Sequence, residues 1–120
     1  SKAMNAVFGD RAKSLPITST KSMVGHLLGA AGGIEAVLTV LSIQHRLLPA
    51  TAGDTPSDPE LGLDVVLHEA RALPSSNVGI STNLAFGGNN AVIVLRSPRH
   101  SSPGDRAPED NRSPEGQRSQ

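Results

Sequence analysis

The residues best suited to chemistry lie in one short stretch, Thr20 to Gly32, which reads TKSMVGHLLGAAG. Lys21 and His26 stand in it just ahead of a long apolar segment. A cation and an imidazole at this place call for a specific reason, because an apolar helix alone would be better served by an ordinary N-cap residue and no charge. An imidazole near a helix N-terminus is favoured in its neutral form, and the helix dipole also favours developing negative charge. We therefore expect His26 to take part in chemistry; the alternatives are a buried structural histidine and, for Lys21, a solvated flanking charge.

The main element that would position these residues is a helix expected from about Met23 to His45. A helix that is apolar almost all the way round is typical of a buried helix. The residues that give this pattern are Leu27, Leu28, Ile34, Val37, Leu38, Val40, Leu41 and Ile43. The glycines between Gly29 and Gly33 each cost about 1 kcal/mol of helix stability relative to alanine. We expect them to permit the close approach of another backbone.

Shorter elements are expected on both sides of this helix. Helical spacing of apolar residues predicts a helix over Lys2 to Phe8, stopped by Gly9 and Asp10. Extended segments are expected at Leu15–Thr18, Val65–Leu67, Asn77–Thr82 and Ala91–Leu95. The loop from Asn83 to Asn90 joins the last two and contains glycines, so it can place backbone N–H groups together. The proline-containing stretch from Ala52 to Leu63 predicts a surface loop.

The composition excludes several classes of function. Eleven basic residues balance eleven acidic ones, so nucleic acid is not an expected partner. The chain has no cysteine, which excludes disulfides, zinc-thiolate sites and a thiol nucleophile within it, and its four histidines have no metal-ligand spacing. Val24 to Ile43 has the length of a membrane span, but His26, Glu35 and the glycines argue against that reading.

The chain divides into a foldable part, residues 1–96, and a tail, residues 97–120. The tail is rich in Ser, Pro, Arg, Asp and Glu without apolar periodicity, and we expect it to be disordered. With 2% aromatic residues, the core must be aliphatic and thin for an independent domain. There is no signal peptide and no initiator Met at position 1, so we expect a processed product or a piece of a longer chain.

The segments TKSMVGHLLGAAGGIEA and NLAFGGNN resemble the C-terminal end of the β-ketoacyl-[acyl carrier protein] synthases and polyketide ketosynthases. The resemblance covers residues 1–96. It implies an α/β, thiolase-like fold with layered α-β-α-β-α architecture, of which these residues would form only the C-terminal part of the second half. The implied activity is an acyl transfer: a decarboxylative Claisen condensation of a malonyl group on acyl carrier protein with an acyl thioester, in fatty acid or polyketide synthesis.

The resemblance also implies roles for individual residues. His26 would be the second active-site histidine, which donates a hydrogen bond to the malonyl thioester carbonyl and stabilises the enolate. Lys21 would orient the site and would be paired with Glu35. The alternative for Glu35 is an exposed residue on the helix without this role. Phe86 would gate acyl entry and lend its backbone N–H to the oxyanion hole, although a core ring is the alternative. Gly87 and Gly88 would let the loop move, and Asn83 and Asn90 would support it structurally.

Three residues depart from the family pattern in this loop. Leu84 stands where an aromatic residue is usual, Ala85 where glycine is usual and Asn89 where threonine is usual. Ala85 would stiffen the gate and Leu84 would reshape the wall of the acyl pocket. The departures put the substrate class in question more than the fold.

The resemblance further implies a cytoplasmic protein, an acyl carrier protein partner, a homodimer or ketosynthase heterodimer, no metal and no cofactor other than the phosphopantetheine that carries the substrates. Because it has no cysteine, the isolated chain is expected to be inactive. Two alternatives remain at this point. One is a noncatalytic partner subunit resembling a chain-length factor, and the other is an inactive truncated remnant or small binding protein.

Overall fold

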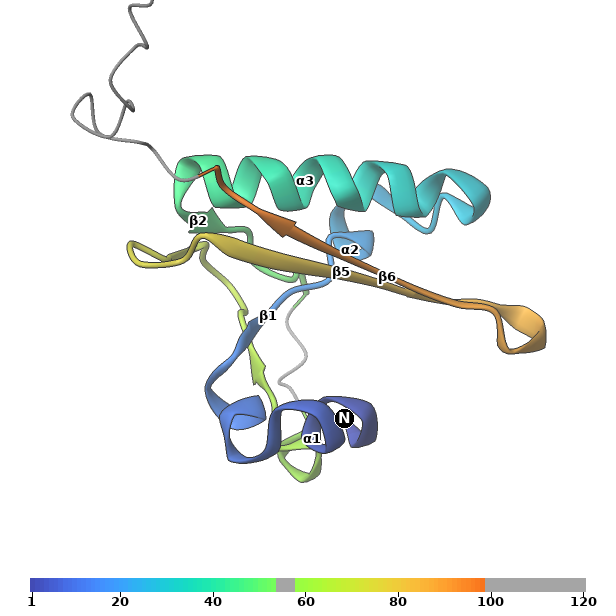
Figure 1. Ribbon diagram of the computed structural model, residues 1–120, viewed down its shortest axis with the longest axis horizontal. Coiled ribbons are helices and arrows are strands. Elements are labelled where there is room, and N and C mark those ends of the chain that lie inside the picture. Colours follow the sequence, from blue (N-terminus) through green and yellow to red (C-terminus); the bar gives the residue numbers. More distant parts are fainter. Residues whose placement is uncertain (54–57, 99–120) are drawn as a thin grey trace, which may run out of the picture.

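The computed structural model describes residues 1–53 and 58–98. Part of the surface loop expected from residue 52 to 63, and residues 99–120 of the expected tail, lie outside the described residues. Figure 1 shows a long helix, α3, lying across a β-hairpin, with the N-terminal helix α1 at the other end of the molecule. The described residues thus mix helices and strands, in agreement with the expected α/β class.

The N-terminal helix is the one predicted. α1 spans Lys2–Phe8 and ends at Gly9, whose φ of 56° places it in the left-handed region. A short 3-10 helix, η1 (Gly9–Ser14), follows, and within it Ala12 is fully buried. Glycine adopts a positive φ without the steric cost that other residues meet, which explains why α1 stops at Gly9.

The continuous helix expected from Met23 to His45 is wrong in its first part. The structure has instead a single turn, α2 (Lys21–Val24), a 3-10 turn, η2 (Leu28–Ala30), and then α3 (Ala31–His45). The chain between them turns at Gly25, with φ 78°, and at Leu28, with φ 49°. Positive φ at two positions cannot continue a right-handed helix. The C-terminal end at His45 agrees with the prediction, and Arg46 caps α3 in the left-handed conformation.

The strands form separate two-stranded pairs. β1 (Pro16–Ile17) pairs in parallel with β3 (Asp64–Val65), and β2 (Leu47–Leu48) pairs antiparallel with β4 (Arg71–Ala72). The expected segment Val65–Leu67 is extended as predicted, since buried Val66 donates its N–H to Ile17 O at 2.8 Å and Leu67 forms a bridge with Thr51. β2 and β4 were not predicted.

The longest pair is the hairpin of β5 (Val78–Leu84) and β6 (Asn90–Arg96). Both strands were predicted, and each is somewhat longer than expected. Alternate residues of β5 face α3. At Gly79 a Cβ atom would lie 2.5 Å from Thr39 Cγ2 and 3.1 Å from Ile43 Cδ1, so the helix packs directly on the backbone of the strand. The close approach expected at the helix glycines is therefore found at a strand glycine instead.

The glycines of the helical run themselves have more room than expected. Around the Cβ positions of Gly29 and Gly33 no atom lies within 4 Å, and at Gly32 the nearest is Asn83 Nδ2 at 3.6 Å. A polar side chain, and not another backbone, approaches Gly32.

The helix α3 is not buried on all sides among the described residues. Only Ala31 and Ile43 of α3 are buried, while Val37 is 56% exposed and Val40 47% exposed. The strand face away from α3 is exposed as well, including Val78, Ile80, Leu84, Val92 and Val94. The expectation of a buried helix fails here because the described residues supply a partner for one face only.

Candidate functional site

A chain of polar contacts joins α2, α3 and β5. Lys21 Nζ, on the first residue of α2, forms an ion pair with Glu35 Oε1, one turn into α3. The other carboxylate oxygen of Glu35 accepts a hydrogen bond from Asn83 Nδ2 at 2.8 Å. The side chains of Lys21 and Glu35 are 32% and 16% exposed. Both oxygens of a largely buried carboxylate therefore have a donor.

These contacts hold Glu35 in its charged form. Burial acts to raise the pKa of Glu35, but hydrogen bonds from Lys21 and Asn83, with the charges of Lys21 and His26, act in the opposite direction. The pKa of Glu35 is lowered as a result.

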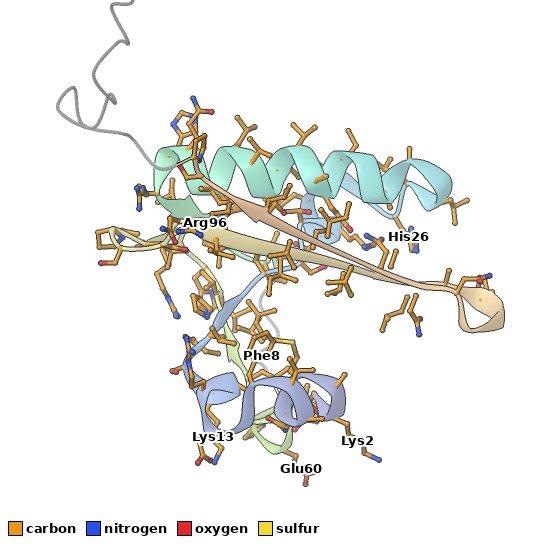
Figure 2. The ribbon with its side chains drawn as sticks, viewed as in Figure 1. Lys2, Phe8, Lys13, His26, Glu60 and Arg96 are labelled. Carbon is orange, nitrogen blue, oxygen red and sulfur yellow. The ribbon has the colours of Figure 1, made fainter. Side chains whose placement is uncertain are left out.

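His26 lies in the turn between α2 and η2, and not directly at the start of α3 as expected. Its Nδ1 accepts a hydrogen bond from the backbone N–H of Leu28 at 3.1 Å. A nitrogen that accepts has no proton, so neutral His26 holds its proton on Nε2 and can donate from there. The side chain is exposed, and Figure 2 shows it below the first turns of α3, on the side of the hairpin. The backbone of Leu27, with φ −82° and ψ 14°, sets the direction of this N–H.

Phe86 lies apart from this group, in the turn of the hairpin. Its side chain is 99% exposed, so it is not a core ring among the described residues. Gly87 and Gly88 have φ of 75° and 80°, and the turn is closed by the bond from Ala85 N to Asn89 O at 2.9 Å. Figure 1 shows this turn projecting away from α3 near the end where α3 begins.

The remaining loop residues take ordinary positions. Asn90 is the first residue of β6 and pairs with Leu84, which is 80% exposed. Ala85, where the family has glycine, has φ −117° and ψ 166°. That is extended backbone, so alanine causes no strain there.

Comparison with known proteins agrees with this motif arrangement. Residues 1–54 match the family model described as "Beta-ketoacyl synthase, C-terminal domain". The chain is 47% identical over 95 residues to a protein of Staphylococcus aureus named 3-oxoacyl-[acyl-carrier-protein] synthase 2. The chain thus resembles the C-terminal part of the β-ketoacyl synthases. A synthase 2 of Synechocystis sp. is 41% identical over 95 residues.

The match covers 79% of this chain but only 23% of each of these synthases. The likeness is thus to a C-terminal portion of a β-ketoacyl synthase, and it implies a thiolase-like fold.

Sequence reasoning missed the hydroxyl groups that fix the segment on both sides of Lys21. Thr51 Oγ1 accepts the N–H of Ser19 at 2.9 Å, and Ser22 Oγ accepts the N–H of Ala52 at 2.8 Å. These bonds hold the synthase motif against the chain that follows β2. The signal was present as a run of Ser and Thr before the motif, but their partner at residue 51 is distant in sequence.

Two further observations concern other kinds of site. Within residues 1–53 and 58–98, no cluster of three or more His, Asp or Glu could hold a metal ion. In the same part of the chain, no helix is long and apolar enough to cross a membrane.

Proposed function

We propose that this chain supplies the decarboxylation side of a β-ketoacyl synthase active site. The reaction of the whole protein would be the condensation of a malonyl group with an acyl thioester, both carried as thioesters on acyl carrier protein before the acyl group moves to the enzyme. The names of the similar proteins, which describe synthases of 3-oxoacyl groups on acyl carrier protein, support this substrate class. The observation that carries the proposal is the bond from Leu28 N to His26 Nδ1, which leaves Nε2–H as a donor.

In the proposed reaction, His26 Nε2–H donates to the thioester carbonyl oxygen of the malonyl group. As the bond to the carboxylate breaks, its electron pair moves into the thioester and carbon dioxide leaves. Negative charge then develops on the oxygen that His26 contacts, where a preorganised donor stabilises it. The resulting carbanion attacks the acyl thioester, and the enzyme's thiolate departs. The nucleophilic cysteine lies outside this chain, which has none.

Lys21 acts in this proposal by orienting the site. Its ion pair with Glu35 joins α2, which comes just before His26, to α3.

Phe86 is proposed as the gate for the acyl chain, with Gly87 and Gly88 as the residues that let it move. Its full exposure and the left-handed glycines beside it support a turn that can change conformation. Asn83, in the strand that enters this turn, and Asn90, in the strand that leaves it, are proposed to support it structurally.

The wider setting is part of the same proposal. Residues 1–96 would form one end of a layered α-β-α-β-α fold, in a cytoplasmic protein that works as a homodimer or ketosynthase heterodimer. No metal or cofactor is required, since decarboxylation of a malonyl thioester needs only a donor for the enolate oxygen.

The test is a chimera in which the aligned 95 residues of this chain replace those of the Staphylococcus aureus synthase 2. We expect the chimera to form β-ketoacyl product from acyl and malonyl carrier protein. His26→Ala should lower that rate at least about 100-fold, the typical effect of removing one such donor. His45→Ala, at the exposed C-terminal end of α3, is the matched control and should leave the rate unchanged.

Equal rates for the chimera and its His26→Ala variant would contradict the proposal. A chimera that folds and binds carrier protein but forms no product would instead favour the noncatalytic partner subunit.

A further inference from the structure

The hairpin places one polar side chain at a junction that the proposed reaction does not use directly. In β5, alternate residues Gly79, Ser81 and Asn83 face α3. Asn83 is the last of them and lies three residues before Phe86. It therefore belongs both to the strand that packs on α3 and to the stem of the turn that holds Phe86.

The contact made by Asn83 is specific in its chemistry. Its Nδ2 donates to Glu35 Oε2 at 2.8 Å, while Glu35 Oε1 is paired with Lys21. The amide is a neutral donor. It satisfies the second carboxylate oxygen of Glu35 and leaves the ion pair with Lys21 in place. An aspartate of the same shape would place a second anion against Glu35.

The amide of Asn83 also lies next to a glycine of α3. Gly32 lies three residues before Glu35, on the same face of the helix, and the position of its missing Cβ is 3.6 Å from Asn83 Nδ2. The amide thus lies over Gly32 while it reaches the carboxylate one turn further along.

We propose that Asn83 is a positioning residue, which ties the hairpin that carries Phe86 to the carboxylate of Glu35 and, through Glu35, to Lys21. This inference rests on the proposed function and extends it. A displacement of the Phe86 turn moves the end of β5 at Asn83, and with it the carboxylate of Glu35 that is paired with Lys21. The position of the gate and the geometry of the ion pair are therefore linked. The link is reciprocal, because a coupling between two sites acts equally in both directions.

The first readout does not depend on catalysis. The full chain, labelled with carbon-13 at the glutamate carboxyl groups, is titrated with acid by NMR, and Glu35 is assigned with Glu35→Gln. Lys21, His26 and Glu35 are the titratable groups that meet at this place. We expect the pKa of Glu35 to lie below the ordinary value for a glutamate, and Asn83→Ala to move it upward because one of the two donors is lost. Asn77→Ala, just before the start of β5, is the matched control and should not move it.

The same titration reads the coupling to the gate. In the unchanged chain, protonation of Glu35 should shift the backbone amide resonances of Phe86, Gly87 and Gly88. In Asn83→Ala this shift should disappear. A pKa of Glu35 that is the same in both proteins, or an amide shift at Phe86 that persists without Asn83, would overturn the proposal.

The second readout is kinetic and uses the chimera. Asn83→Asp should lower kcat about tenfold, as expected for loss of a hydrogen bond to a charged group, with a smaller change in KM. Adding Glu35→Gln should restore part of the loss, since it removes the repulsion between two carboxylates, whereas Asn77→Asp should have no effect. Additive losses in the double variant would contradict the proposal. A chimera without any activity would refute the proposed function, and the titration of the chain would still decide the role of Asn83.

Discussion

At the scale of single residues, the account depends on a few directed hydrogen bonds. His26 receives the N–H of Leu28 on one ring nitrogen, which leaves the other to donate. Glu35 receives Lys21 and Asn83 on its two oxygens. Lys21 and His26 could be selected from the sequence by residue type. The tautomer of His26 could not, because it depends on how the turn through Leu27 directs the backbone N–H of Leu28.

Acidification should weaken the fold through Glu35. Because its pKa is lowered in the folded chain, its contribution to stability is present above the pKa of the unfolded chain and is lost as pH falls through the folded pKa. We expect Glu35→Gln to cost about 1 to 2 kcal/mol near neutral pH, and progressively less as the pH falls through the folded pKa. Urea unfolding of the full chain over a series of pH values from neutral to acid checks this, with Glu60→Gln on an exposed carboxylate as the control. A cost that does not change with pH would refute it.

At the scale of elements, the site is held by the packing of α3 on β5. Thr39 and Ile43 of α3 lie against Gly79, with distances from its missing Cβ of 2.5 and 3.1 Å. This contact sets the distance between β5 and α3, and therefore the place where Asn83 meets Glu35. A side chain at Gly79 would lift the strand away from α3.

Gly79→Ala should therefore destabilise the chain by about 1 to 3 kcal/mol, the usual cost of overpacking. Gly33→Ala is a matched control, since no atom lies within 4 Å of its Cβ position and alanine favours helix. It should stabilise the chain slightly. Thermal unfolding of the two variants gives the comparison, and equal stabilities would show that α3 does not rest on the strand backbone.

The elements also show which parts of the fold were predictable. α1, the C-terminal end of α3 and the strands β5 and β6 followed from apolar spacing and from turn residues. The break between α2 and α3 did not, because Leu27 and Leu28 extend the apolar pattern that a helix would have. The two-residue strands β2 and β4 are too short to have a pattern of their own. Their pairing is fixed by contacts distant in sequence.

At the scale of the whole molecule, the described residues do not cover their own apolar surface. Val37 and Val40 on α3, and Val92 and Val94 on β6, are each about half exposed or more. Apolar side chains exposed on faces of α3 and of the hairpin are typical of faces that meet other protein. The chain spans 23% of the length of the synthases it matches, which is in keeping with such faces.

The isolated chain should therefore bind a hydrophobic dye under native conditions. In the chimera the same residues would be covered, and dye binding per molecule should fall severalfold. The unchanged Staphylococcus aureus synthase 2 provides the baseline. Strong dye binding by the chimera, or none by the isolated chain, would show that these faces are not covered by the rest of a synthase.

The central claim is that His26 stabilises the enolate formed when the malonyl group loses carbon dioxide. The measurement that tests it most directly is carbon dioxide release from malonyl carrier protein by the chimera, followed separately from transfer of the acyl group to the enzyme. We predict that His26→Ala lowers the rate of carbon dioxide release about 100-fold or more and leaves acyl transfer near its original rate. Carbon dioxide release that persists in His26→Ala, with acyl transfer lost instead, would contradict the account.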